Sequence, residues 1–169
     1  NKKDGQLRNK KYVRYILFQL IVDVETFLAI NDRLPEDRHE IIKDLSRSEI
    51  YWYEALFPQW FMKEDKHLPT WKQRLMADEF ADDDKKDREK LITLVKQQNG
   101  GTCWRYILDL AMATDIIVNS DTGYPICVQY TTNAKEHTKD KIADWNKIIF
   151  YYNRYLHNTI KSKKMLKSR

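Results

Sequence analysis

An apolar run over residues 12–30 constrains the fold of this chain more than any other feature. Along one side, apolar residues recur at the spacing of a helix, at Val13, Ile16, Leu17, Leu20, Val24, Phe27 and Leu28. A second side of the same helix is also apolar, through Tyr15, Phe18 and Val22. A helix that is apolar on most sides belongs at the centre of a protein, so we expect a central helix over residues 6–33.

The same run does not predict a membrane span. A helix that crosses a bilayer needs roughly 20 mostly uncharged residues. Here the run is interrupted by Arg14, Gln19, Asp23 and Glu25. The basic start of the chain also lacks the short apolar core and small-residue cleavage site of a secretory signal. We therefore expect a soluble protein with no membrane partner.

The composition is that of a folded, helix-rich protein. The chain has 169 residues, of which 42% are hydrophobic, with only four glycines and four prolines. This is long enough to bury a core, and the composition excludes a disordered chain. Cys103 and Cys127 lack zinc-finger spacing and make no disulfide framework, which predicts reduced thiols in the cytoplasm.

The net charge decides little about partners. The formal charge is +5, but 30 basic residues stand against 25 acidic ones, so a nucleic-acid interface would have to come from local clustering. One such cluster lies at the carboxyl end, at Lys161, Lys163, Lys164 and Lys167. These lysines are candidate phosphate contacts, and the alternative is a frayed, solubilising terminus.

The first half of the chain is expected to be helical throughout. Acidic residues in the first turn after Pro35 predict a second helix, and the capping-box pattern from Ser46 to Glu49 predicts another. Trp52, Trp60 and Trp71 then alternate with lysines. They could stack on single-stranded nucleic acid, but their helical spacing favours an aromatic core between packed helices.

The glycine pair at residues 100–101 predicts the end of a helix over residues 85–98. It also predicts a boundary between a helical region, 1–98, and a second region, 99–169, and the two regions could pack as one compact domain. After it we expect a short helix capped by Thr102, then strands over residues 115–118 and 125–131. A long helix should follow from about residue 133. The chain is therefore predicted to be a predominantly helical α+β protein with a small β-ribbon packed between helices.

The two expected strands carry the residues with chemical interest. Asp115 begins the first strand, while Gln129 and Thr131 are two residues apart and share a face of the second. Metal-dependent phosphodiester hydrolysis needs carboxylates that hold a divalent cation and a cationic group for the developing charge.

The order of helix, "TDIIV", turn, "PICVQYTT" and helix resembles the PD-(D/E)xK superfamily of restriction-endonuclease-like proteins over residues 101–156. In this resemblance Asp115 matches the aspartate of the motif, Gln129 its second acidic position and Thr131 its lysine. Threonine also replaces the proline before Asp115. Glutamine offers a neutral carbonyl oxygen, so metal affinity should fall, and threonine supplies no charge.

The resemblance implies a nucleic-acid-acting nuclease that uses Mg²⁺ or Mn²⁺. Asp115 and Gln129 would be the metal and catalytic positions, with Asp109 on the preceding helix as a further ligand. Because some members of the superfamily supply a motif residue from the neighbouring helix, Lys139 or Lys141 would be the cationic catalytic group.

Two other interpretations stay open. The strands could form a plain hairpin with a structural Asp115. The protein could also be a non-catalytic binding or assembly module whose helical half docks a protein partner, or whose basic end contacts nucleic acid. A phosphate-binding loop is excluded, because the glycine pair lacks the lysine and serine of such loops. The four histidines show no metal-ligand spacing.

Overall fold

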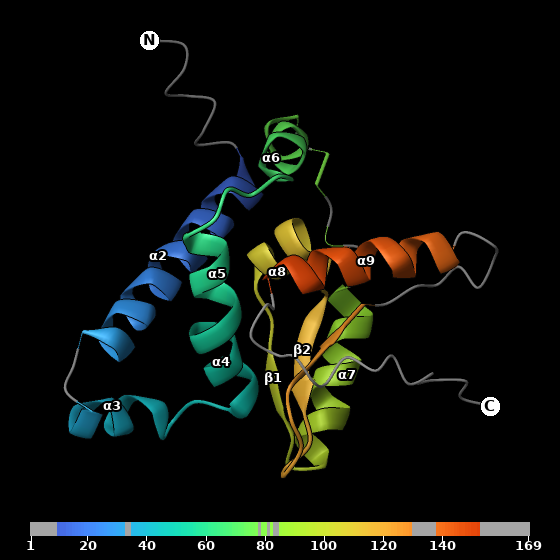
Figure 1. Ribbon diagram of the computed structural model, residues 1–169. Coiled ribbons are helices and arrows are strands. Elements are labelled where there is room, and N and C mark those ends of the chain that lie inside the picture. Colours follow the sequence, from blue (N-terminus) through green and yellow to red (C-terminus); the bar gives the residue numbers. More distant parts are fainter. Residues whose placement is uncertain are drawn as a thin grey trace, which may run out of the picture.

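The computed structural model describes residues 10–32, 35–77, 79–80, 82, 85–129 and 138–152. Within these ranges helices predominate around a small three-stranded antiparallel sheet, which confirms the predicted α+β fold class (Figure 1). The helices are α2 (Lys11–Asn31), α3 (Pro35–Ile42), α4 (Arg47–Tyr51), the π-helix η1 (Trp52–Leu56), α5 (Phe57–Phe61), α6 (Leu68–Met76), α7 (Lys85–Gln97), α8 (Tyr106–Met112) and α9 (Thr138–Tyr152). The strands are β1 (Gly101–Cys103), β2 (Ile116–Asn119) and β3 (Ile126–Val128).

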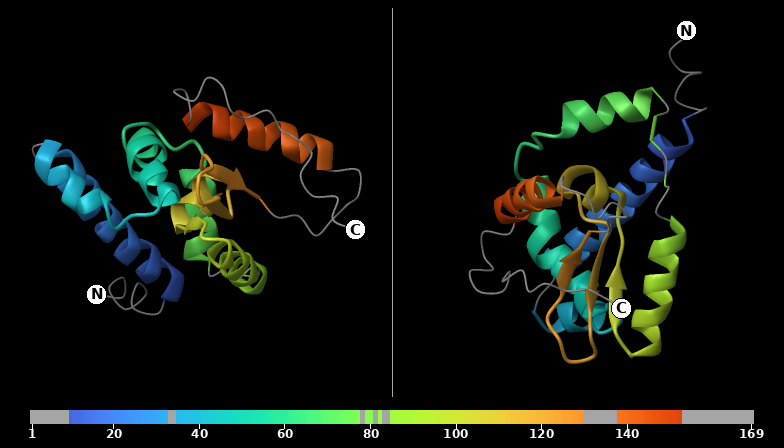
Figure 2. Two further views of the ribbon diagram at one scale, coloured as in Figure 1. Left: turned by 90° about the horizontal axis from the view of Figure 1, so that it is seen from below. Right: turned by 90° about the vertical axis from the view of Figure 1, so that its right-hand side faces the viewer.

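The sheet has the order β1-β2-β3 and lies between helices. Cys103 pairs with Ile117, and Ile117 pairs in turn with Cys127. α4 packs against β1 and β2 from one side, and α7 packs against the same strands from the other (Figure 2). Strand β1 was not expected from the sequence, because three residues are too few to show an alternating pattern.

Two glycines allow this close packing. A Cβ on Gly100 would lie 2.4 Å from the carbonyl oxygen of Asn119, and one on Gly101 would lie 2.5 Å from the Asn119 side-chain oxygen. The same amide oxygen accepts hydrogen bonds from the Ser48 backbone N–H at 3.0 Å and from the Ser48 hydroxyl at 2.7 Å. The start of α4 is thereby fixed to the sheet through a buried polar contact.

The hydrophobic core continues across the expected boundary near residue 98. One cluster joins Ile16 of α2 and Trp52 of η1 to Leu108 of α8 and Ile149 of α9. Trp60 and Trp71 pack against this cluster and both donate their indole N–H to Asp65, at 3.0 and 2.9 Å. This confirms the aromatic-core interpretation of the tryptophans. The division into residues 1–98 and 99–169 stays a prediction.

Several local expectations need correction. The capping box at Ser46 and Glu49 is confirmed, but the predicted Thr102 cap is wrong, because that residue belongs to β1 and helix α8 begins after Arg105. The second strand was expected over residues 125–131, but β3 ends at Val128, so Gln129 lies outside it. The predicted helix over residues 6–33 is present as α2, Lys11–Asn31, but the expectation that it is central is wrong, because it lies at the edge of the molecule in two perpendicular views (Figures 1 and 2). In the described part of the chain, no helix is long and apolar enough to span a membrane.

Candidate functional site

Asp115 and Gln129 lie beside the last residue pair at one end of the β2–β3 ladder. Ile116 pairs with Val128, and the Asp115 N–H donates to the Val128 carbonyl oxygen at 2.9 Å. Ile116 and Val128 are the last residue pair of this antiparallel ladder, so Asp115 and Gln129 lie just beyond it, one on each chain segment. Asp115 is half-buried and Gln129 is exposed.

The other predicted catalytic and metal residues are less closely defined. Asp109 is half-buried in the first turn of α8, and Lys139 is exposed near the start of α9. Lys141 lies on α9, and its side chain is outside the described part. Also outside the described residues are Thr131, Lys161, Lys163, Lys164 and Lys167.

The described residues do not assemble an evident metal centre. Among them, no group of three or more histidine, cysteine, aspartate or glutamate side chains could hold a metal ion. Beside the end of the sheet lie one carboxylate, Asp115, and one neutral amide, Gln129, a weak donor set for a hard cation. Metal binding by Asp115, Gln129 and Asp109 stays a prediction.

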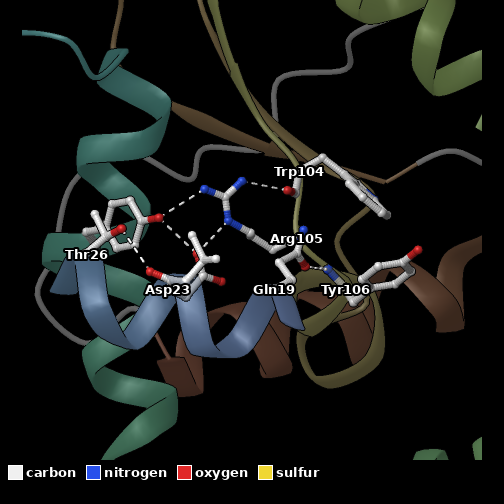
Figure 3. Close-up of polar contacts among 8 residues, drawn as sticks. Gln19, Asp23, Thr26, Trp104, Arg105 and Tyr106 are labelled. Atoms are coloured by element: carbon white, nitrogen blue, oxygen red, sulfur yellow. Dashed lines mark hydrogen bonds and ion pairs between the residues drawn. The ribbon is translucent and has the colours of Figure 1, made fainter. Parts of the chain in front are cut away.

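A second cluster of functional groups is buried beneath α2, around Asp23 (Figure 3). The Asp23 side chain is only 1% exposed. Its Oδ1 accepts from Arg105 Nε at 2.7 Å and from the Tyr53 hydroxyl at 2.9 Å. Arg105 also donates to the Tyr53 oxygen at 3.1 Å and to the Trp104 carbonyl oxygen at 2.8 Å. The guanidinium therefore joins α2, η1 and the segment after β1.

The electrostatics of the cluster follow from burial and from the ion pair. Burial raises the pKa of Asp23, while the Arg105 charge and the hydrogen bonds of Arg105 and Tyr53 oppose that rise. Burial raises the pKa of the Tyr53 hydroxyl as well. For Arg105, the loss of solvation is outweighed by surrounding negative groups, so its pKa is raised and it stays charged.

Local structure explains how these groups meet. Asp23 and Gln19 lie one helical turn apart on α2, and the Gln19 amide oxygen accepts from the Tyr106 backbone N–H at 2.7 Å (Figure 3). Tyr53 is carried by a π-helix, an arrangement that appears often at functional sites. Two of the polar interruptions of the apolar run, Gln19 and Asp23, thus face inward, where they hold α2 against α8 and η1.

The opposite face of α2 is apolar and exposed. Its large side chains, with exposed fractions between 41% and 71%, are Tyr15, Leu17, Phe18, Ile21, Val22 and Leu28. An open depression of about 390 Å³ adjoins this face and is lined by Tyr15, Phe18, Gln19, Val22, Asp23, Arg105 and Tyr106. We call the six exposed apolar residues the α2 face.

Sequence reasoning missed both the buried cluster and the exposure of the α2 face. The signal for the cluster was Asp23, which shares with Ile16 and Ile30 the spacing of one apolar helix face and requires a partner when that face is buried. The signal for the face was an apolar pattern on more sides than one protein core can cover. Comparison with protein-family models, curated proteins and solved structures finds no match for this chain. Its candidate functions therefore follow from its own geometry.

Proposed function

We propose that this protein is a non-catalytic binding or assembly module that docks a protein partner on the α2 face. The observation that carries this proposal is the concentration of six large apolar side chains on one exposed helix face. From their exposed fractions, these side chains together present on the order of 600 Å² of surface, the upper end for the largest apolar patch on a monomer.

The support beneath the α2 face favours a preformed docking surface. Ile16 and Ile30 are buried on the inner side of the helix, and the Asp23–Arg105 pair fixes its centre. A rigid surface loses little conformational entropy on binding. The adjoining depression would accept an apolar side chain of the partner, as the central pockets of protein interfaces do.

The free thiols support a reducing compartment for this module. Cys103 and Cys127 are both free, and Cys103 is buried. We place the protein in the cytoplasm, where cysteines stay reduced.

A photoreactive amino acid at position 18 tests the docking proposal. Phe18 is 71% exposed on the α2 face, and Phe150 on α9, at 64%, is a matched control outside it. In cells of the source organism, irradiation should yield a covalent adduct with a protein from position 18 and none from position 150. Equal yields at both positions, or no adduct at position 18, would refute a docking role for the α2 face.

A second candidate function is favoured by the position of Asp115 and Gln129 at the same end of the sheet, beside the Ile116–Val128 pair. We propose for this end of the sheet a divergent PD-(D/E)xK nuclease activity on DNA or RNA. Asp115, Gln129 and Asp109 would hold Mg²⁺ or Mn²⁺, which supplies a nucleophilic water and neutralises developing charge. Lys139 or Lys141 would be the cationic group, and the terminal lysines would contact phosphates.

Cleavage of labelled single- and double-stranded DNA and RNA with Mg²⁺ or Mn²⁺ tests this second candidate. Activity should disappear in EDTA and in Asp115→Ala, and should persist in Asp121→Ala, an exposed acid in the turn between β2 and β3. Cleavage that survives in Asp115→Ala would assign the activity elsewhere or to a contaminant. No cleavage by the parent protein would leave the binding module alone.

A further inference from the structure

A regular seam of side chains, three of them from the α2 face, runs along the exposed side of α2. Arg14, Phe18, Ile21, Glu25 and Leu28 follow one another at alternating spacings of four and three residues, and Lys11 extends the series at its amino end. All six side chains are exposed. This alternation is the heptad spacing by which two helices pack along each other.

The charges on this seam are separated along the helix. Its amino-terminal half carries Lys11 and Arg14, and its carboxyl-terminal half carries Glu25. Neither Arg14 nor Glu25 forms an ion pair with another residue in the described part of the chain. A helix with basic residues at one end of an apolar centre and an acidic residue at the other can pair with a reversed copy of itself, with opposite charges facing.

From this pattern we infer that the partner of the α2 face is a second copy of this chain, paired antiparallel through α2 about a two-fold axis. The inference rests on the proposed docking function. If Phe18 of one copy lies opposite Ile21 of the second, the same axis places Arg14 opposite Glu25. It also places the aliphatic stem of Lys11 over Leu28. Every layer of the seam then has a compatible partner, as a self-complementary interface requires.

The opposite orientation is disfavoured by the same residues. Parallel pairing would place Arg14 against Arg14 and Glu25 against Glu25, and like charges at facing positions repel. Charge complementarity therefore selects the antiparallel arrangement.

The available area is sufficient for a dimer. If the α2 faces of two copies are buried against each other, the dimer buries on the order of 1,200 Å² in total. This is the lower end of the range for specific protein interfaces. The outer side of α2 lies at the edge of the molecule in two views, so the described elements leave it accessible (Figures 1 and 2). An interface of this size predicts a reversible dimer whose population depends on concentration.

Charge reversal tests the orientation directly. Sedimentation equilibrium should show the parent protein passing from monomer to dimer between low and high micromolar concentrations. Arg14→Glu alone, and Glu25→Arg alone, should each weaken the dimer by at least about tenfold, because each dimer contains the pair twice and reversal makes both contacts repulsive. The double variant Arg14→Glu/Glu25→Arg should regain parental dimer strength within about threefold, since the charges are only exchanged.

Two controls keep the result specific. Lys86→Glu reverses an exposed charge on α7, outside the α2 face, and should leave the dimer unchanged. Circular dichroism of each variant should match the parent, because the changed side chains are exposed. A dimer that resists both single reversals, or a double variant that stays monomeric, would overturn the antiparallel pairing.

Sedimentation and photocrosslinking together distinguish a failure of self-pairing from a failure of docking. A parent protein that stays monomeric at every concentration, while position 18 still forms an adduct with a different protein, overturns self-pairing and leaves the docking function intact. If position 18 forms no adduct and the parent is monomeric, both proposals are overturned. An adduct between two copies of the chain, lost in Arg14→Glu and restored in the double variant, supports both.

Discussion

Replacing Arg105 by methionine isolates the contribution of the buried pair beneath α2. Arg105 donates hydrogen bonds to Asp23, Tyr53 and the Trp104 carbonyl oxygen. Methionine keeps much of the length of the side chain but removes its charge and these donors. Because Asp23 is almost wholly buried, removing its cation leaves an uncompensated charge, which costs about 3–5 kcal/mol of unfolding free energy. At this chain length that loss lowers Tm by roughly 10 °C.

The loss in Arg105→Met should depend on pH. Burial raises the pKa of Asp23, so the folded protein holds this proton more tightly than the unfolded chain does. For a carboxyl group with a raised folded pKa, its contribution to stability is greatest below its ordinary pKa and declines as pH rises through the folded pKa. Without the Arg105 charge the pKa of Asp23 rises further, so this decline becomes larger and extends to higher pH.

Urea denaturation at several pH values between about 5 and 7.5 measures the effect. The difference between parent and Arg105→Met should grow toward neutral pH. Adding Asp23→Asn to Arg105→Met should remove the pH dependence and recover part of the stability. As a matched control, Arg38→Met breaks an exposed pair with Glu54 and should cost at most about 1 kcal/mol. A cost for Arg105→Met as small as this control, or one that is constant with pH, would refute the reasoning.

Three further variants or treatments test the packing. Gly101→Ala should lower the unfolding free energy by about 1–3 kcal/mol, because its Cβ would overlap the Asn119 side chain and Ser46; urea denaturation measures this loss. Ser46→Ala should cost about 1 kcal/mol in the same assay, because it removes the capping box formed with Glu49. Burial raises the pKa of the Cys103 thiol to about 12, so iodoacetamide should alkylate it at pH 8 only as fast as the protein opens, as followed by mass spectrometry.

Each of these three expectations has a control whose result could contradict it. A Cβ at Gly123 would meet mainly the Ser120 hydroxyl, which can rotate away, so a cost of Gly123→Ala equal to that of Gly101→Ala would argue against the tight approach of β1 and α4. Thr93→Ala removes a hydroxyl from the exposed face of α7, and Ser46→Ala should cost clearly more than this. Alkylation of Cys103 at the rate of an unfolded control in urea would contradict its burial.

Much of the local structure could be predicted because its determinants are close in sequence. The apolar spacing of residues 13–28, the capping pattern at Ser46 and the turn residues between β2 and β3 each act within a few positions. These patterns predicted the α+β class and the positions of most helices correctly. The position of Asp115 and Gln129 at the same end of the hairpin was also foreseeable, since a short turn fixes which ends of its strands meet.

Other features depended on contacts between distant segments. Strand β1 is only three residues long and exists because Cys103 pairs with Ile117, so its sequence predicted the start of a helix instead. Asp23 and Arg105 meet only after α2 docks beside α8, and no local pattern joins two residues so far apart.

The sequence by itself therefore determined the helices that have a periodic apolar pattern, and the charged ends of the α2 seam. It also determined that the apolar run over residues 12–30 is not a membrane-type helix. Only the tertiary structure decided which side of α2 became the core. Both sides are apolar, but Gln19 and Asp23 carry polar groups that need partners when buried, and Tyr53, Arg105 and Tyr106 supply hydrogen bonds to them. Docking that side inward leaves Phe18 and Ile21 exposed, because one helix cannot bury every face against a core of this size.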